Sequence, residues 1–380
     1  MRAGRSRVDR HHGKVEAPGS NPGRSIEISL FFEAITKLMI KILGGGLSGL
    51  SAAINLAKNE REVTIFEKEE KVGVGKSDAQ LLGNWETKND ILDFLSEINI
   101  DVRYESKLEK IVLVAPNLKN KAVIYSDDIP VGYVVLRKGD NSLENFLARK
   151  AKKLGAKILT GIKEKIQAEI IATGSKRMDG IGYGCVLKGN FDKEKALILF
   201  DDRIAPKGYV YLLPHSRDKA TFAIAMRPKA DPKRSLEKAM KHKIFRDTIE
   251  SSTLLYNFSG YVNFSIPKTA KFGNSLLVGE AAGFQDAAFG FGMKYAFHSG
   301  YLAAKAIVEN KDYDKLWKKA FLRDLKKSLS IRKIFDKLDY NSLLNKLIPK
   351  IGERSMTEFK KIYSSKFRMA NLFLKSLLEI

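Results

Sequence analysis

The chain has 380 residues, of which 44% are hydrophobic and 29% are charged, and this length predicts a folded protein of two or three units. Its formal net charge of +23 indicates an acidic partner, and nucleic acid, anionic lipid head groups and phosphorylated substrates all meet that description. The single cysteine, Cys185, excludes an internal disulfide, a CxxC redox pair and a cysteine-based zinc or iron–sulfur site, which fits a reducing cytosol.

Residues 1–38 differ in composition from the rest of the chain. The first 25 are rich in Arg, Gly and Pro, and residues 17–23 form a turn-prone stretch with nothing to bury. The codons for residues 19–23 can match the T-arm of a transfer-RNA gene. We therefore expect residues 1–38 to be an extension from a start codon assigned too early, with Met39 as the natural start, or else a disordered basic tail. Charges at Glu33, Lys37 and Lys41 interrupt the apolar run there, so we expect no segment that crosses a membrane.

A glycine-rich motif follows directly. The apolar run 39–43 ends in Gly44-x-Gly46-x-x-Gly49, which opens a helical pattern, and a second apolar run then ends in Glu67. This order is typical of a dinucleotide-binding βαβ unit: the glycines permit the tight turn, the approach of a pyrophosphate and close packing of helix on strand. Glu67, 23 residues after Gly44, can accept hydrogen bonds from a ribose diol. The predicted cofactor contacts are Gly44, Gly45, Gly46, Leu47, Ser48, Gly49, Glu67 and Lys68.

The next hundred residues alternate between helical and strand patterns, which suits a parallel sheet. Residues 71–86 are polar and interrupted by glycines, so we expect a loop there. The predicted helices cover 91–98 and 141–154, and the predicted strands cover 111–114, 122–125, 133–137, 158–159 and 170–174.

The pattern changes after Gly174. Short β-rich segments separated by turn residues predict an inserted antiparallel sheet, with strands at 183–187, 197–200, 209–213 and 221–225. A helical connector over 236–248 and a returning parallel strand over 275–278 follow. A long helix is expected after Phe291, and mainly helical structure from Lys311 onward.

The returning strand leads into a second motif. Gly279-Glu280-Ala281-Ala282-Gly283, with the glycines and Ser299 that follow, resembles the C-terminal flavin motif G-D-A-A-G-x-x-x-P-x-x-G-x-G, which separates FAD proteins from NAD dehydrogenases. The resemblance implies a carboxylate delivered to the ribityl chain and a helix N-terminus aimed at the flavin pyrimidine, where it favours negative charge. Glu280 stands where Asp is usual, and Ala288 or a neighbour where Pro is usual. The implied flavin-side contacts are Gly279, Glu280, Gly290, Phe291, Gly292 and Met293.

Three further segments narrow the resemblance to one family. Residues 133–143 resemble the y-v-v-x-R-x-x-F-D-x-x-L segment of flavoproteins with the p-hydroxybenzoate hydroxylase type of fold, and residues 172–174 resemble the strand that returns over the adenosine. Residues 208–214 resemble the G-Y-x-W-x-F-P segment of the geranylgeranyl reductase family, with Tyr211 and Leu213 in place of Trp and Phe. Over residues 39–310 the chain therefore resembles an archaeal-type geranylgeranyl reductase.

This resemblance implies FAD as the cofactor, with Arg137 beside it, and a substrate cavity lined by Tyr209, Tyr211 and Pro214. We predict an α/β fold: a Rossmann-like FAD-binding domain with an inserted antiparallel β-sheet substrate domain and a helical C-terminal region. The predicted division assigns 39–178 and 268–310 to FAD binding, 179–267 to the substrate domain and 311–380 to the basic helical region, which holds 18 Lys and Arg against 8 Asp and Glu.

The chemistry is expected to come from the flavin itself, with no metal, because the five histidines show no convincing ligand spacing. The favoured reaction is hydride transfer to a carbon–carbon double bond of a geranylgeranyl-type isoprenoid lipid. Electrons would come from an external donor, reduced ferredoxin or NAD(P)H. Some family members carry a cysteine in the loop after the ribose-binding acid, but residues 71–80 have none, and Cys185 on a predicted strand fits a buried hydrophobe better than a reactive thiol.

The basic C-terminal region leaves two interpretations open. Apolar residues at helical spacing, including Phe321, Leu325 and Phe335, alternate with lysines. Such a helix can lie on an anionic membrane, which would give a cytoplasmic protein peripheral to the inner face. It can equally cover the FAD domain and leave a solvated outer face.

Competing functions remain open as well. A flavin monooxygenase or halogenase shares the fold, although the chain lacks a clear NADPH-binding D-G segment and the halogenase signals. An electron-transfer dehydrogenase would ordinarily show cysteine ligands for a cluster. From another class, a basic flavin-containing RNA-binding or RNA-modifying protein is allowed by charge, but no recognised RNA module supports nucleic acid as the partner.

Overall fold

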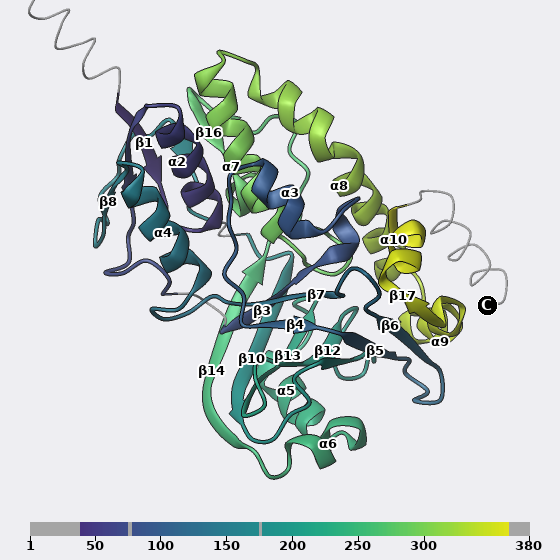
Figure 1. Ribbon diagram of the computed structural model, residues 1–380. Helices are drawn as coiled ribbons and strands as arrows, with labels where there is room; N and C mark the ends of the chain where they lie inside the picture. Colours follow the sequence, from purple (N-terminus) through teal and green to yellow (C-terminus); the bar gives the residue numbers. More distant parts are fainter. Residues whose placement is uncertain (1–38, 75–77, 175–176, 365–380) are drawn as a thin grey trace, which may run out of the picture. The chain divides into compact units, whose positions relative to one another are not determined.

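A mostly parallel sheet carries the glycine-rich turn in the computed structural model, which describes residues 39–74, 78–174 and 177–364. Residues 1–38, expected to be an extension before Met39 or a basic tail, lie outside the described residues. The sheet has the order β15-β16-β9-β1-β2-β8, and β1 pairs in parallel with β9 while β2 pairs in parallel with β8. Figure 1 labels β1, β8 and β16 of this sheet. Its strands are β1 (Met39–Leu43), β2 (Glu62–Phe66), β8 (Lys157–Leu159), β9 (Ile170–Ile171), β15 (Lys271–Phe272) and β16 (Ser275–Leu277).

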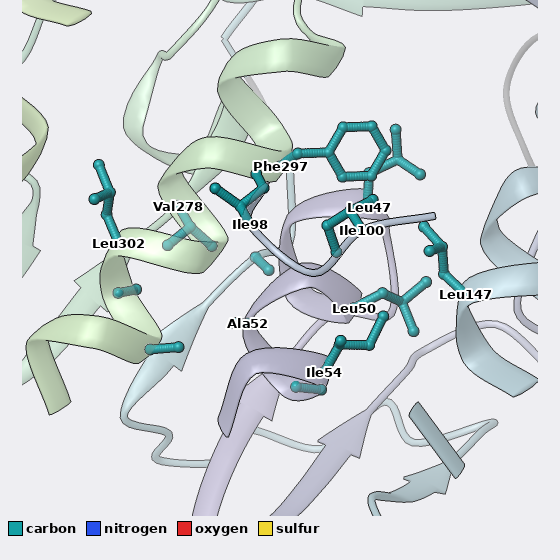
Figure 2. Close-up of a cluster of buried hydrophobic side chains, with 14 of the residues drawn as sticks. Leu47, Leu50, Ala52, Ile54, Ile98, Ile100, Leu147, Val278, Phe297 and Leu302 are labelled. Carbon is teal, nitrogen blue, oxygen red and sulfur yellow. The ribbon is translucent and has the colours of Figure 1, made fainter. Parts of the chain in front are cut away.

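Helices pack on this sheet through a continuous apolar core. Figure 2 shows Leu50 and Ile54 of α2 among buried side chains that include Phe297 of α7 and Leu147 of α4. Helices α2 and α7 approach closely because Gly300 has no side chain: a Cβ there would lie 2.2 Å from the Ser48 carbonyl oxygen. These helices are α2 (Leu47–Lys58), α3 (Ile91–Glu97), α4 (Leu143–Lys153) and α7 (Met293–Val308).

A second, eight-stranded sheet has the order β14-β10-β13-β12-β11-β5-β6-β17. Most of its pairs are antiparallel, but β11 pairs in parallel with β5 and β17 pairs in parallel with β6. The strands are β5 (Lys110–Val114), β6 (Lys121–Tyr125), β10 (Gly180–Lys188), β11 (Lys195–Leu199), β12 (Tyr209–Pro214), β13 (Lys219–Met226), β14 (Thr253–Val262) and β17 (Glu353–Ser355).

The two faces of this sheet are buried by different elements. One face packs against α5 (Pro232–Met240) and α6 (Lys243–Ile249), with Phe222 and Phe245 in ring contact at 5.0 Å between centroids. The other face packs against a three-stranded sheet and the C-terminal helices. That small sheet consists of β3 (Ala79–Gly83), β7 (Gly132–Leu136) and β4 (Ser106–Leu108).

The C-terminal region is helical as predicted, and its apolar face is covered by the rest of the protein. Phe321, Leu325 and Phe335 of α8 are each only 1% exposed. The covering interpretation is therefore confirmed for this helix, since these side chains are not free to enter a membrane. Within the described residues no helix is long and apolar enough to cross a membrane. The helices are α8 (Tyr313–Lys337), α9 (Tyr340–Ile351) and α10 (Met356–Ser364).

The predicted strands and helices are present, but four expectations need correction. The segment 71–86, expected as a loop, contains β3 and the 3-10 helix η1 (Asn84–Glu86), because β3 pairs along its length with β7. The expected connector 236–248 is two helices, α5 and α6. Strands β4, β14, β15 and β17 were not predicted. The large sheet also recruits β5 and β6, which the domain division had assigned to the FAD-binding domain.

Candidate functional site

The glycine turn after β1 has the geometry of a nucleotide cradle. Gly44 has a φ of +106°, and a Cβ there would lie 2.5 Å from the carbonyl oxygen of Ala172, the residue after β9. At Gly49 a Cβ would lie 2.1 Å from the Gly44 carbonyl oxygen, so the helix and strand can meet only through glycine. Gly46 differs from both: no described atom lies within 4 Å of the position its Cβ would take. The backbone at Gly46 therefore faces open space, as the approach of a pyrophosphate requires.

The N-terminus of α2 opens onto that space. Gly46 is its N-cap residue, no side chain caps the first turn, and the first turn contains no acidic residue. Free N–H groups and the positive end of the helix dipole favour an anion here. Leu47 and Ser48 form this first turn, and both are buried.

The predicted ribose-binding acid lies beside the turn. Glu67 Oε2 accepts a hydrogen bond of 2.6 Å from the Gly45 backbone N–H, and Oε1 accepts one of 3.0 Å from the Glu69 N–H. These bonds hold the carboxylate at the carboxyl end of β2, next to the cradle. Lys68 does not join it: its ammonium pairs with Glu69 at 3.3 Å, and its side chain is 72% exposed.

The return motif brings a second acid to the same edge of the sheet. The chain leaves β16 into the 3-10 helix η2 (Gly279–Ala282), where Gly279 has a φ of +57° and donates its N–H to Ser299 Oγ at 2.9 Å. A Cβ added at Gly174, beyond the end of β9, would lie 3.6 Å from Glu280 Oε2. Strands β16, β9 and β1 are neighbours and parallel, so their carboxyl ends lie at one edge of the sheet. Glu280, Gly174 and the glycine turn after β1 each follow one of these ends.

The loop after η2 is fixed by Asp286. Its Oδ1 accepts the Phe289 N–H at 2.7 Å, its carbonyl accepts the Gly290 N–H at 2.9 Å, and burial raises the pKa of its carboxyl group. Gly290 has a φ of +83°, which favours glycine. Gly292 then caps α7 without a side-chain hydrogen bond, and no acid stands in the first turn, which begins at Met293. A second uncapped helix N-terminus is thereby available for negative charge, with Phe291 at its entrance.

Arg137 is held at the end of β7 by buried partners. Its Nε and Nη2 contact Glu144 Oε1 at 2.8 and 2.6 Å, and its Nη1 donates to Gln80 Oε1. Glu144 is 5% exposed, and its Oε2 has no hydrogen-bond partner within the described residues. The guanidinium is thus oriented by the protein itself, while its contact with a cofactor stays a prediction.

The predicted substrate residues do not all share one face of the sheet. Tyr209 and Tyr211 point to the face that carries Phe289 and Phe291, and the Tyr209 hydroxyl donates to the Phe289 carbonyl oxygen at 2.6 Å. Burial raises the pKa of both phenols, that of Tyr211 to about 12. Pro214 lies on the opposite face, in a cavity shared with Leu212, because alternate strand residues face opposite sides. The structure therefore does not bring Pro214 together with the two tyrosines.

A buried polar cluster on the tyrosine face escaped the sequence analysis. His215 follows β12 at an odd position, as Tyr209 and Tyr211 do, and so continues their side of the strand. Its Nδ1 lies 3.2 Å from Asp78 Oδ2, and its Nε2 lies 2.6 Å from Thr221 Oγ1. The Tyr256 hydroxyl also donates to Asp78. Burial raises the pKa of Asp78, but the hydrogen bonds from His215 and Tyr256 outweigh it and lower the pKa overall. No local motif could have joined Asp78, His215 and Tyr256, since these three come from distant parts of the chain.

The remaining chemical candidates have structural roles. Cys185 is fully buried, and burial raises the pKa of its thiol to about 11, which fits the predicted hydrophobe. Burial lowers the pKa of His298 to about 4, and its ring packs on Phe94 with centroids 5.1 Å apart. Across the described residues, no group of three or more His, Cys, Asp or Glu side chains could hold a metal ion.

Comparison with known proteins agrees with this arrangement. The NAD(P)-binding Rossmann-like domain family matches residues 42–90. Digeranylgeranylglycerophospholipid reductase 2 of Methanothermobacter thermautotrophicus is 25% identical, over 88% of this chain and 98% of that protein. The protein of the same name from Methanosphaera stadtmanae is 26% identical, over 73% of this chain and 80% of that protein. This chain is also 25% identical to an uncharacterized protein of Methanocaldococcus jannaschii, of which it spans 58%.

Solved structures give the same fold. A geranylgeranyl bacteriochlorophyll reductase-like protein of Thermoplasma acidophilum has a TM-score of 0.72 at 21% identity, over 90% of this chain and 96% of that one. CtdE, solved in complex with FAD and a substrate, has a TM-score of 0.60 at 13% identity, over 90% of this chain and 100% of that one. The comparisons confirm the predicted resemblance to geranylgeranyl reductases and the predicted α/β fold, and they support an oxidoreductase of the FAD-binding type.

Proposed function

We propose that this relative of the digeranylgeranylglycerophospholipid reductases is an FAD-dependent reductase of carbon–carbon double bonds in an isoprenoid lipid. The observation that carries the proposal is the pairing of two uncapped helix N-termini, those of α2 and α7, with two acids at the carboxyl edge of one sheet. A dinucleotide with a flavin at one end has an anionic pyrophosphate, a ribose diol and an electron-accepting ring that these features fit.

The chain offers a matching group for each part of FAD. The open backbone at Gly46 and the first turn of α2 would receive the pyrophosphate, and Glu67 would accept from the adenosine ribose. Glu280 would accept from a ribityl hydroxyl, since its extra methylene relative to Asp still permits a hydrogen bond. The N-terminus of α7 would lie by the flavin pyrimidine. Arg137, oriented by Glu144, would lie beside the cofactor.

Reduced FAD, when bound, would supply the hydride for reduction of the double bond, and a nearby donor would supply the proton that completes the addition. The protein residues then bind and orient the two partners and exclude water. Tyr209 and Tyr211 offer an aromatic, apolar wall next to the loop of Phe289 and Phe291, and the Tyr209–Phe289 hydrogen bond fixes that wall to the flavin loop. An isoprenoid chain has only apolar surface to bury, which this wall matches. The wall therefore favours such a chain over a polar substrate.

The electron donor is proposed to be external, either reduced ferredoxin or NAD(P)H. The only cysteine is buried on the opposite face of the large sheet from Tyr209, in the cluster that packs against α5 and α6. A mechanism with a thiol at the flavin is therefore not proposed. For location we propose the cytoplasm, with the enzyme meeting its lipid at the inner face of the membrane.

The test uses the flavin as its own indicator. Purified holoenzyme is reduced anaerobically with dithionite, and digeranylgeranylglycerophospholipid is added while the flavin absorbance is followed. We expect the oxidised spectrum to return without oxygen, and a fully saturated lipid of the same head group should give no return. A protein that binds no flavin, or a reduced flavin that responds only to oxygen, would contradict the proposal. The second outcome would favour a flavin monooxygenase. A flavin-dependent brominase has a similar fold to this chain, with a TM-score of 0.60.

A further inference from the structure

A cavity of about 460 Å³ lies between η1, α7, α8 and α10, and the proposed reaction does not account for it. Five lysines line it: Lys88, Lys294, Lys327, Lys360 and Lys361. Three acids share the lining, namely Glu86, Asp286 and Asp324. Formal charge is therefore positive inside a pocket whose size suits a small ligand or one part of a larger ligand.

The lysines divide into two that are fixed and three that are available. Lys294 Nζ donates to the Glu86 carbonyl at 2.8 Å and lies 3.5 Å from Asp324, and Lys360 Nζ donates to the Asn89 carbonyl at 2.7 Å. By contrast, none of Lys88, Lys327 and Lys361 forms an ion pair with any part of the chain that the structure describes. Lys327 instead lies over the Tyr363 ring at 4.6 Å.

The acids do not neutralise these lysines fully. Burial raises the pKa of Glu86 to about 7, and burial also raises the pKa of Asp286. Glu86 Oε1 is buried without a hydrogen-bond partner within the described residues. Burial likewise lowers the pKa of Lys327, which shows that its charge is poorly solvated. An anion bound beside Lys327 would stabilise its charged form.

Part of the cavity wall is apolar and adjoins the loop of Phe289 and Phe291. Trp85, Ile129 and Ile331 line the cavity and belong to the same apolar cluster as Tyr209 and Phe291. The Trp85 and Phe291 rings are in edge contact, with centroids 4.9 Å apart. The exposed Lys88 and Lys361 stand at the other side. The cavity thus combines exposed lysines with an apolar patch beside Phe291, and the buried Asp286 and Lys294 also line it.

We propose that this cavity binds the phosphate group of the lipid substrate, whose apolar chains would leave it past Trp85, on the side of the loop of Phe289 and Phe291. This inference rests on the proposed function. Ammonium groups on flexible stems make charge-assisted hydrogen bonds to phosphate, and Lys327 and Lys361 are the donors that no carboxylate occupies. The head group would fix which part of the chain reaches the flavin, because Trp85 of the cavity wall contacts Phe291 of the proposed flavin loop.

The binding test uses holoenzyme and glycerol phosphate as the probe, followed by calorimetry. The double variant Lys327→Met, Lys361→Met keeps the apolar stems and removes both charges. We expect it to bind glycerol phosphate at least tenfold more weakly, with an unchanged flavin spectrum. The matched control is Lys319→Met, an exposed lysine on α8 outside the cavity, which should bind as the unchanged protein does. Equal binding by the double variant would overturn the proposal.

A kinetic comparison separates this inference from the proposed reaction. The double variant should lose at least tenfold in kcat/KM for the phospholipid and keep its kcat/KM for geranylgeraniol, which has no phosphate. If the unchanged holoenzyme reduces neither, the proposed reaction fails, and the calorimetric comparison still decides whether the cavity binds phosphate. If inorganic phosphate binds as tightly as glycerol phosphate while phospholipid kinetics stay unchanged in the variant, the cavity serves a free anion and the head-group assignment is wrong.

Discussion

The glycine at position 46 allows cofactor binding to be separated from folding. Its backbone has φ of −80° and ψ of −177°, an extended conformation that alanine adopts freely, and no described atom lies within 4 Å of the added Cβ. In Gly46→Ala, the reduced entropy of the unfolded chain stabilises by about 0.4–1 kcal/mol, and the poorer N-cap costs a similar amount. The free energy of unfolding without cofactor should therefore change by less than about 0.5 kcal/mol.

FAD binding should change far more. The new methyl group occupies the space through which a phosphate oxygen approaches the N–H groups of α2 to about 2.9 Å. Loss of one hydrogen bond to a charged group costs about 1.5–3 kcal/mol, which corresponds to a roughly tenfold to hundredfold rise in Kd. Apoprotein is titrated with FAD by fluorescence quenching, and the unfolding of the same apoprotein is followed in urea.

Two other glycines provide the contrast. Gly182→Ala on β10 has its nearest neighbouring atom at 3.8 Å, far from any clash, and should leave both FAD affinity and stability nearly unchanged. Gly49→Ala would place a Cβ 2.1 Å from the Gly44 carbonyl oxygen, so it should damage the fold and FAD binding together. If Gly46→Ala bound FAD as tightly as the unchanged protein, the pyrophosphate would not lie at the α2 terminus and the reasoning would be refuted.

Three further predictions concern the buried groups of the site. Burial raises the pKa of Glu86 from an ordinary 4.5 to about 7, so the unfolded chain loses this proton first as pH rises, and the free energy of unfolding should fall between about pH 4.5 and pH 7. The Glu86→Gln variant should not show this decline and should be more stable at pH 8 by on the order of 2–3 kcal/mol. Urea unfolding at pH 5 and pH 8 measures both effects. The Arg137→Met variant leaves the buried Glu144 carboxylate without its cation, which should lower the free energy of unfolding by about 3–5 kcal/mol. The double variant Arg137→Met, Glu144→Met should recover most of this stability but still bind FAD more weakly. Full recovery of FAD affinity would exclude Arg137 from the cofactor site. The Tyr209→Phe variant removes the hydrogen bond to the Phe289 carbonyl oxygen and should lower the free energy of unfolding by about 1 kcal/mol, measured by thermal unfolding. It should also lower kcat with the lipid. An unchanged kcat would show that this bond does not order the flavin loop.

The parts of the site that sequence could predict are those encoded by neighbouring residues. The roles of Gly44, Gly46 and Gly49 follow from backbone geometry within six residues, and the structure shows the tight turn, the open approach and the close packing that these roles require. The Glu67 carboxylate ends the next strand and so reaches the same edge. The α7 terminus follows in the same way from the glycines around Phe291.

The parts that sequence missed depend on pairing between distant segments. Strand β3 is five residues without a regular apolar alternation and pairs along its length with β7, and β17 is three residues paired with β6. The Asp78–His215 contact likewise requires the large sheet to be assembled first. The misplacement of Pro214 is different in kind. The two-residue period of a strand already separates it from Tyr209 and Tyr211, so that signal was present in the sequence.

The most direct test of the account is the mass of the lipid product. Holoenzyme reduced anaerobically with dithionite is incubated with digeranylgeranylglycerophospholipid, and the extracted lipid is analysed by mass spectrometry beside a reaction with Gly46→Ala protein. The account predicts that the lipid gains the mass of two hydrogen atoms for each double bond reduced, and that the variant forms correspondingly less product at limiting FAD. A lipid of unchanged mass, or one that gains oxygen when air is admitted, would contradict it.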